Sequence, residues 1–132
     1  MFIHHIGYAV RSISDSIPFF ESLGFQSEGD VYVDIDRSIY IHFMINGNYK
    51  IELVESLDTL KSDVKNYILK NGNIPYHICY MVESIDEKIK DLKNKRFKLI
   101  KKPQCAIALE GEKVAFLYHK NVGLIELLEK GR

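Results

Sequence analysis

Hydrophobic residues recur along this chain with two periods, the two-residue alternation of a strand and the spacing of about 3.6 residues of a helix. Residues 3–10 alternate around β-branched and aromatic positions and predict a strand. A helix is expected next, beginning at Asp15 with Ser14 as its N-cap. Residues 40–54 predict a hairpin, because Asn46-Gly47-Asn48 separates two apolar runs.

The second half of the chain repeats this order of elements. It predicts a strand over residues 76–82, a helix capped by Ser84, and later strands at residues 97–100, 114–118 and 124–128. Residues 58–72 predict a linker helix without a counterpart in the second half. We therefore expect one domain over residues 1–132, with module one at about 1–57, the linker helix at about 58–72 and module two at about 73–132.

Each half carries a His at the opening of one apolar strand and a Glu inside another. His5 precedes Glu52 by 47 residues, and His77 precedes Glu126 by 49 residues. Taken singly, a His at a strand end is more often structural, and a strand Glu more often faces solvent. The recurrence of both residue types in nearly the same register favours a shared role as metal ligands for all four.

Strand alternation explains how these side chains reach one face. His5 shares a face with Gly7, opposite the bulky apolar positions of its strand. Ile51 and Leu53 are expected to point into the core, which leaves Glu52 on the other face, where a buried carboxylate needs a partner. Two imidazoles and two carboxylates balance the charge of a divalent ion and suit Zn, Ni, Co or Mn. We therefore predict one divalent metal per site, with an open position for water or substrate.

The other candidate residues are interpreted as structural. Glu55 and Glu129 end their strands and are expected to be exposed. Cys79 shares the predicted face of His77 and is interpreted as a packed thiol. The remaining histidines have no repeated partner and are interpreted as structural or exposed residues: His4, His42 and His119.

Composition narrows the class of protein. The 18 basic and 18 acidic side chains give zero formal charge, which disfavours nucleic acid as a partner. No run approaches the ~18 apolar residues of a membrane helix, and the N-terminus does not resemble a secretory signal. Cys79 and Cys105 form no CxxC pair and suit a reducing cytoplasm. The basic stretch from Lys88 to Lys102 is interpreted as solvated surface, with attraction of an anionic substrate as the weaker alternative.

The repeated unit resembles the vicinal oxygen chelate superfamily over nearly the whole chain. The similarity is carried by "HHIGYAV", "FFESLGF", "KIELVE", "NGNIPYHICYMVESIDE" and "KVAFLYHKNVGLIELLE". It is nearest to methylmalonyl-CoA epimerases and small glyoxalase-like proteins. The resemblance implies an α+β fold in which two tandem βαβββ modules form a U-shaped, half-barrel mixed sheet around a metal site. It also implies that the metal-binding positions are His5, Glu52, His77 and Glu126.

The resemblance also implies a chemistry. In that superfamily the metal chelates neighbouring substrate oxygens, and a base removes the proton next to a carbonyl to give an enolate. Glu126 is the first candidate for this base. Epimerases of this type have a second acidic base, and an ungapped alignment places Asp36 at that position. Asp is one methylene shorter than Glu, and a misplacement of about 1 Å can slow a reaction ~10²-fold.

Three functions compete at this point. The leading expectation is a metal-dependent isomerase or lyase acting on a thioester or hemithioacetal, of the methylmalonyl-CoA epimerase or lactoylglutathione lyase type. The second is a drug- or metabolite-binding protein like the bleomycin-resistance relatives, which generally lack a full metal quartet. The third is a ring-cleaving dioxygenase, which Glu52 as a fourth ligand disfavours. A homodimer is expected, because open sheets leave edges to cover.

Overall fold

The computed structural model describes residues 1–57, 66, 68 and 70–130. Most of the linker helix predicted over residues 58–72 lies outside these described residues. The chain divides into two compact units, one formed by His5–Tyr76 and the other by Met1–His4 together with His77–Arg132. The first four residues therefore group with the second half of the chain.

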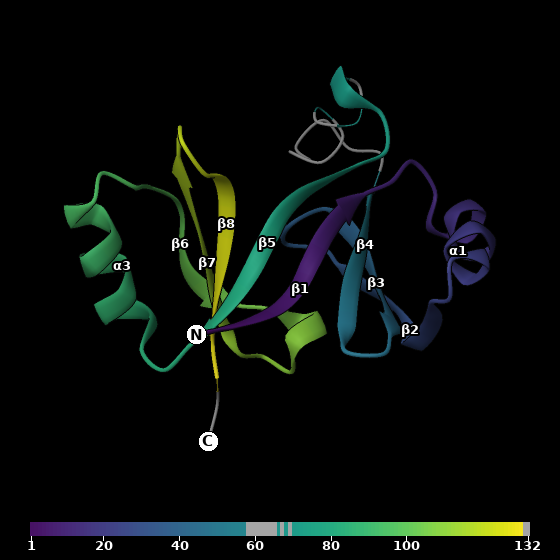
Figure 1. Ribbon diagram of the computed structural model, residues 1–132, viewed down its shortest axis with the longest axis horizontal. Helices are drawn as coiled ribbons and strands as arrows, with labels where there is room; N and C mark the ends of the chain where they lie inside the picture. The colour runs from purple at the N-terminus through teal and green to yellow at the C-terminus, as the bar shows by residue number, and fades with distance from the viewer. Residues whose placement is uncertain (58–65, 67, 69, 131–132) are drawn as a thin grey trace. The chain divides into compact units, whose positions relative to one another are not determined.

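Among the described residues, the main elements of the first unit are a ten-residue helix and four strands, the first of which begins in the other unit (Figure 1). In chain order these are β1 (Phe2–Ala9), α1 (Ile13–Ser22), β2 (Gln26–Asp34), β3 (Ile39–Asn46) and β4 (Tyr49–Ser56). The strands lie in the order β2-β3-β4-β1. β1 runs parallel to β4, and the other neighbours are antiparallel.

The second unit repeats this topology. It contains β5 (Ile74–Val82), α3 (Ile85–Asn94), β6 (Lys98–Cys105), the short 3-10 helix η1 (Ile107–Leu109), β7 (Lys113–His119) and β8 (Gly123–Glu129). The strand order is β5-β8-β7-β6, with β5 parallel to β8. The predicted α+β fold of two βαβββ modules, with mixed strand directions, is confirmed.

In each unit the helix packs on the bulky face of the strands. In the first unit, Ile51 and Leu53 of β4 join Val10, Ile13 and Met44 in a buried cluster. In the second unit, the corresponding cluster consists of Val82, Ile85, Ile89, Ala115, Leu117, Ile125 and Leu127. The neighbours of each Glu in sequence therefore point into the core, as the strand alternation predicted. The opposite face, which we call the ligand face, carries His5 and Glu52 in one unit and His77 and Glu126 in the other.

The start of α1 differs from the sequence prediction. The helix begins at Ile13, and its N-cap is Ser12, whose Oγ accepts a hydrogen bond from the backbone N–H of Asp15 at 3.1 Å. The prediction of Ser14 as the cap is therefore wrong. Ser84 caps α3 as predicted and accepts from the backbone N–H of Glu87.

Glu55 and Glu129 are not the exposed strand ends that the sequence predicted. Each is partly buried and accepts a hydrogen bond from the first backbone N–H of its helix. Such N–H groups have no partner inside a helix, so each carboxylate satisfies a donor that would otherwise need water. These two bonds tie the last strand of each module to its helix.

Among the described residues, no helix is long and apolar enough to cross a membrane.

Candidate metal centre

The first unit brings His5 and Glu52 together. His5 lies on β1 and Glu52 on the parallel neighbour β4, where Gly7 is the register partner of Glu52. His5 Nε2 is 3.4 Å from Glu52 Oε1. His5 is 1% exposed and Glu52 5% exposed, so the pair is shielded from solvent.

The second unit repeats this pair with His77 and Glu126. His77 lies on β5 and Glu126 on the parallel neighbour β8, with Cys79 as the register partner of Glu126. His77 Nε2 is 3.1 Å from Glu126 Oε1. The two residues are 4% and 1% exposed. The duplication of the sequence is thus also a duplication of a buried imidazole–carboxylate pair.

A phenylalanine completes each pair and was missed in the sequence. Phe43 is the cross-strand partner of Glu52, and its ring meets the ring of His5 edge to face at 5.7 Å between centroids. Phe116 is the partner of Glu126 and meets His77 in the same way at 5.3 Å. The predicted turn of Asn46-Gly47-Asn48 is one residue longer than the observed turn, in which Asn46 pairs with Tyr49 and Phe43 therefore lies opposite Glu52. Each module therefore holds a His–Glu–Phe set on its ligand face.

The donor chemistry of the two pairs fits a divalent metal. Each pair presents one ring nitrogen and one carboxylate oxygen from adjacent strands, and both are ligand types that divalent transition metals accept. A buried carboxylate is costly unless a positive charge compensates it, and a divalent cation compensates two. The residues present are therefore suitable ligands.

Asp36 is not brought to the ligand face. It is exposed in the turn of residues 35–38 between β2 and β3, while β3 carries buried Ile41 and Phe43 on the ligand face. Ile39, the residue of β3 next to this turn, is four residues from Phe43. At the rise of an extended strand, these two residues are roughly 13 Å apart. The structure thus gives no support to Asp36 as a base beside His5 and Glu52.

The other histidines have structural contacts of their own. His42 Nε2 lies 2.9 Å from Ser27 Oγ, and His42 is buried. His119 Nδ1 accepts from the backbone N–H of Asn121, and its ring packs against Phe97. Cys79 is completely buried, and no disulfide joins it to Cys105.

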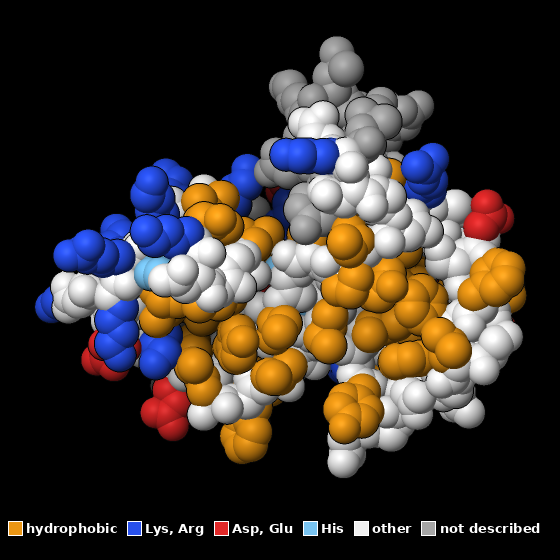
Figure 2. Space-filling model, turned by 45° about the horizontal axis from the view of Figure 1, so that its top comes forward, with side chains coloured by type: hydrophobic (Ala, Val, Ile, Leu, Met, Phe, Trp, Pro, Cys, Tyr) orange, Lys and Arg blue, Asp and Glu red, His pale blue; other side chains and the backbone are white. Residues whose placement is uncertain are grey.

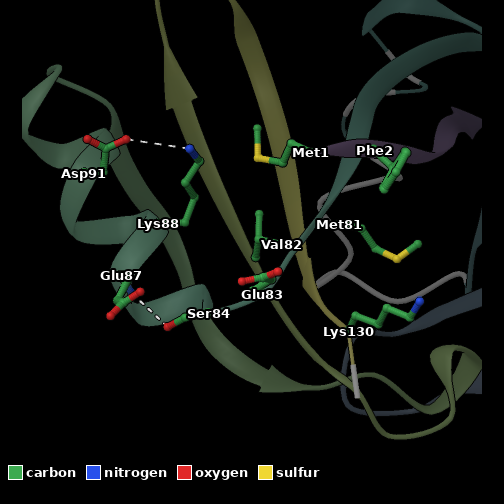
Figure 3. Close-up of a pocket in the computed structure, with 10 residues that line it drawn as sticks. All are labelled: Met1, Phe2, Met81, Val82, Glu83, Ser84, Glu87, Lys88, Asp91 and Lys130. Carbon is green, nitrogen blue, oxygen red and sulfur yellow. Dashed lines mark hydrogen bonds and ion pairs between the residues drawn. The ribbon is translucent and has the colours of Figure 1, made fainter. Parts of the chain in front are cut away.

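Two further features lie in the unit that contains α3 and β6. Figure 2 shows Lys and Arg side chains gathered at the left of the view. A groove of about 620 Å³ runs past the start of α3 (Figure 3). Met81 and Val82 contribute apolar surface to it, and Lys88 pairs with Asp91 at 3.7 Å along its edge. His77 and Glu126 do not line this groove, so it is distinct from their pair.

Comparison with known proteins identifies the family. The chain belongs to the glyoxalase/bleomycin resistance protein/dioxygenase superfamily, which matches residues 4–116. It is 31% identical over 130 residues to the uncharacterised protein YqjC of Bacillus subtilis strain 168, covering 96% of this chain and 91% of that protein. It is 29% identical over 130 residues to the mitochondrial methylmalonyl-CoA epimerase of Homo sapiens, covering 95% of this chain and 72% of the epimerase.

A solved structure supports the same fold assignment. A hypothetical protein from Bacillus halodurans C-125 is 34% identical, with a TM-score of 0.86 over 99% of this chain and 95% of its own. The family resemblance drawn from the sequence is therefore confirmed. Members of this superfamily typically bind a divalent metal, which agrees with the donor chemistry of the two His–Glu pairs.

Proposed function

We propose that this protein is a divalent-metal-dependent enzyme that removes a proton next to a carbonyl group and so forms an enolate. His5, Glu52, His77 and Glu126 would together hold one metal ion, which we expect to be Zn, Ni, Co or Mn. The observation that carries this proposal is the buried His–Glu pair on the ligand face of each module. A buried carboxylate is costly unless a positive charge compensates it, and a bound divalent ion would supply that charge.

The proposed reaction uses the residues of the two pairs in different ways. The divalent ion, when bound, supplies Lewis-acid stabilisation of the negative charge that develops on the carbonyl oxygen. His5, Glu52 and His77 would act as ligands, and the Phe rings against the two histidines hold the imidazoles in place. Glu126 would also accept the proton, because its carboxylate is buried beside His77 and is shielded from competing water.

We propose an acyl-CoA thioester of the methylmalonyl-CoA type as the preferred substrate. The similarity to mitochondrial methylmalonyl-CoA epimerase over 95% of this chain supports it. A lactoylglutathione lyase activity on a hemithioacetal remains the related reaction to compare. An epimerase also needs an acid on the opposite side of the reacting carbon, and the exposed turn of Asp36 gives that role no support. A homodimer in the cytoplasm belongs to the same proposal.

The direct test is an assay of metal-reconstituted protein against methylmalonyl-CoA and the methylglyoxal–glutathione adduct side by side. Exchange of the substrate α-proton in heavy water, followed by NMR, reports the proton abstraction itself. Glu126→Gln should lower this exchange about 100-fold or more, because a positioned base is removed. Glu83→Gln, which changes an exposed carboxylate, is the matched control.

Two outcomes would overturn the proposal. The first is a purified protein that binds no divalent metal, and the second is full turnover of both substrates by Glu126→Gln. Tight binding of a small molecule by metal-free protein, without turnover, would instead favour the alternative of a non-catalytic drug- or metabolite-binding protein.

A further inference from the structure

Lys50 lies on the ligand face of the first unit, beside the proposed metal ligands. It is two residues before Glu52 on β4, so the two side chains leave the strand on the same face. β1 and β4 are parallel, with Ile6 opposite Ile51. His5 precedes Ile6 and Lys50 precedes Ile51, so Lys50 lies opposite His5 on the neighbouring strand.

The Lys50 side chain extends across the Phe ring of this module. Its Nζ lies 5.5 Å from the centroid of Phe43, within the range of a cation–π interaction. The same Nζ lies 2.9 Å from Glu28 Oε1 on β2. Glu28 is the register partner of Phe43, and Phe43 is the register partner of Glu52. A cation is thus held on the ligand face, level with His5 and two residues before Glu52 on β4.

The present partner of Lys50 is easily exchanged. The Glu28 side chain is 44% exposed and that of Lys50 is 27% exposed, so water and salt screen their attraction. Exposed ion pairs of this kind contribute little to stability. A second carboxylate arriving on the ligand face could replace Glu28 at small cost, while the Phe43 ring keeps the ammonium group in place.

The charge balance of the proposed metal site indicates a role for the Lys50 ammonium group. Two carboxylates and two neutral imidazoles leave a divalent ion with zero net charge, so the ligand set offers no excess positive charge to an anionic substrate. The second module has Leu124 at the position that corresponds to Lys50, although it keeps the His–Glu–Phe set. The scaffold of the ligand pair therefore does not require a lysine there.

We propose that Lys50 binds a carboxylate of the substrate and thereby selects acyl thioesters that carry a carboxylate on the carbon that loses its proton. This inference rests on the proposed function, and it adds the residue that recognises the carboxylate of that substrate. Glu28 acts as a competing internal partner that holds Lys50 until the substrate carboxylate displaces it.

The test measures binding by calorimetry in zinc-loaded protein. Methylmalonyl-CoA and propionyl-CoA are compared, because they share the thioester and the CoA group and differ in the carboxylate. Lys50→Met should weaken methylmalonyl-CoA binding about tenfold or more and leave propionyl-CoA binding within about twofold, because one charge-assisted contact is lost. Lys50→Arg should restore part of the difference, and Lys90→Met, an exposed lysine on α3, should change neither.

Glu28→Gln separates recognition from a purely structural ion pair. If Lys50 recognises the substrate, removing its competitor should tighten methylmalonyl-CoA binding, opposite in direction to Lys50→Met. Equal affinity ratios in wild type and Lys50→Met, or weakening by both variants alike, would overturn the inference. Zinc binding is titrated first in each variant. Loss of zinc binding in the wild type would contradict the proposed function, whereas normal zinc binding with an unchanged affinity ratio contradicts only the role of Lys50.

Discussion

The backbone N–H of Ile85 donates a hydrogen bond of 2.9 Å to Glu129 Oε2, which joins the first residue of α3 to the last residue of β8. The same bond recurs at 2.7 Å from Ile13 to Glu55, at the start of α1 and near the end of β4. In each module, the strand that carries the candidate ligand Glu therefore also holds the helix that covers its other face.

Removing these carboxylates should destabilise the fold without touching the ligand pairs. We expect Glu55→Ala and Glu129→Ala each to lower the free energy of unfolding by about 1–2 kcal/mol, because a helix N-terminal donor loses a charged acceptor. Urea denaturation measures this change. The exposed Glu83→Ala should stay within about 0.5 kcal/mol of wild type. Equal stabilities for all three variants would contradict the assigned role of the two carboxylates.

The helix ends offer a second matched pair, Gly24 and Arg96. Each residue follows a helix and has a positive φ, 95° for Gly24 and 71° for Arg96. Each donates its backbone N–H to a carbonyl in the last turn of that helix. Side chains with a Cβ rarely adopt this conformation. Arg96→Gly should therefore raise the free energy of unfolding by roughly 0.5–1 kcal/mol.

Gly24→Ala should have the opposite effect and lower stability by more than about 1 kcal/mol. Its added Cβ would lie 3.0 Å from Asn46 Nδ2 in addition to the unfavourable φ. Thermal and urea unfolding of the two variants would show the difference in sign. A loss of stability in Arg96→Gly would show that the arginine side chain contributes more than its backbone strain costs.

The phenylalanines opposite each Glu should affect metal affinity more than stability. Phe43→Leu and Phe116→Leu keep an apolar side chain but remove the edge contact to His5 and His77. Groups that orient a metal ligand typically change affinity 10–100-fold, so we expect a loss of about tenfold in each variant. Calorimetric titration with Zn²⁺ measures it, with exposed Phe19→Leu as the control. Unchanged affinity would mean that the histidines are oriented by other contacts.

The repeated His–Glu pattern could be found from the sequence because both members recur in nearly the same register and because strand alternation fixes the face of each. Phe43 was missed because the turn was predicted as Asn46-Gly47-Asn48, whereas Asn46 pairs with Tyr49 and so makes Phe43 the partner of Glu52. The hydrogen bonds that Glu55 and Glu129 accept from their helices could not be predicted from the sequence. They join residues more than 40 positions apart, and helix-capping rules consider only local neighbours.

Asp36 shows the limit of an ungapped alignment. The alignment places Asp36 before the hairpin strands, and counting along the sequence cannot reveal that residues 35–38 form an exposed turn. The turn that carries Asp36 is exposed, and the end of β3 next to it is roughly 13 Å along the strand from Phe43. We therefore expect Asp36→Asn to keep wild-type turnover. A loss of about 100-fold in kcat, measured with methylmalonyl-CoA, would instead restore Asp36 as a catalytic acid or base.

The central claim is that His5, Glu52, His77 and Glu126 hold one metal ion together. Titration of metal-free protein with Co²⁺, followed by visible absorption, tests this claim most directly, because it counts ions per chain and reports the ligands without any assay of activity. We expect one Co²⁺ per chain, and a loss of affinity of at least about 100-fold in each of His5→Ala, Glu52→Ala, His77→Ala and Glu126→Ala. Two ions per chain, or full affinity after substitution of both ligands in one module, would contradict it.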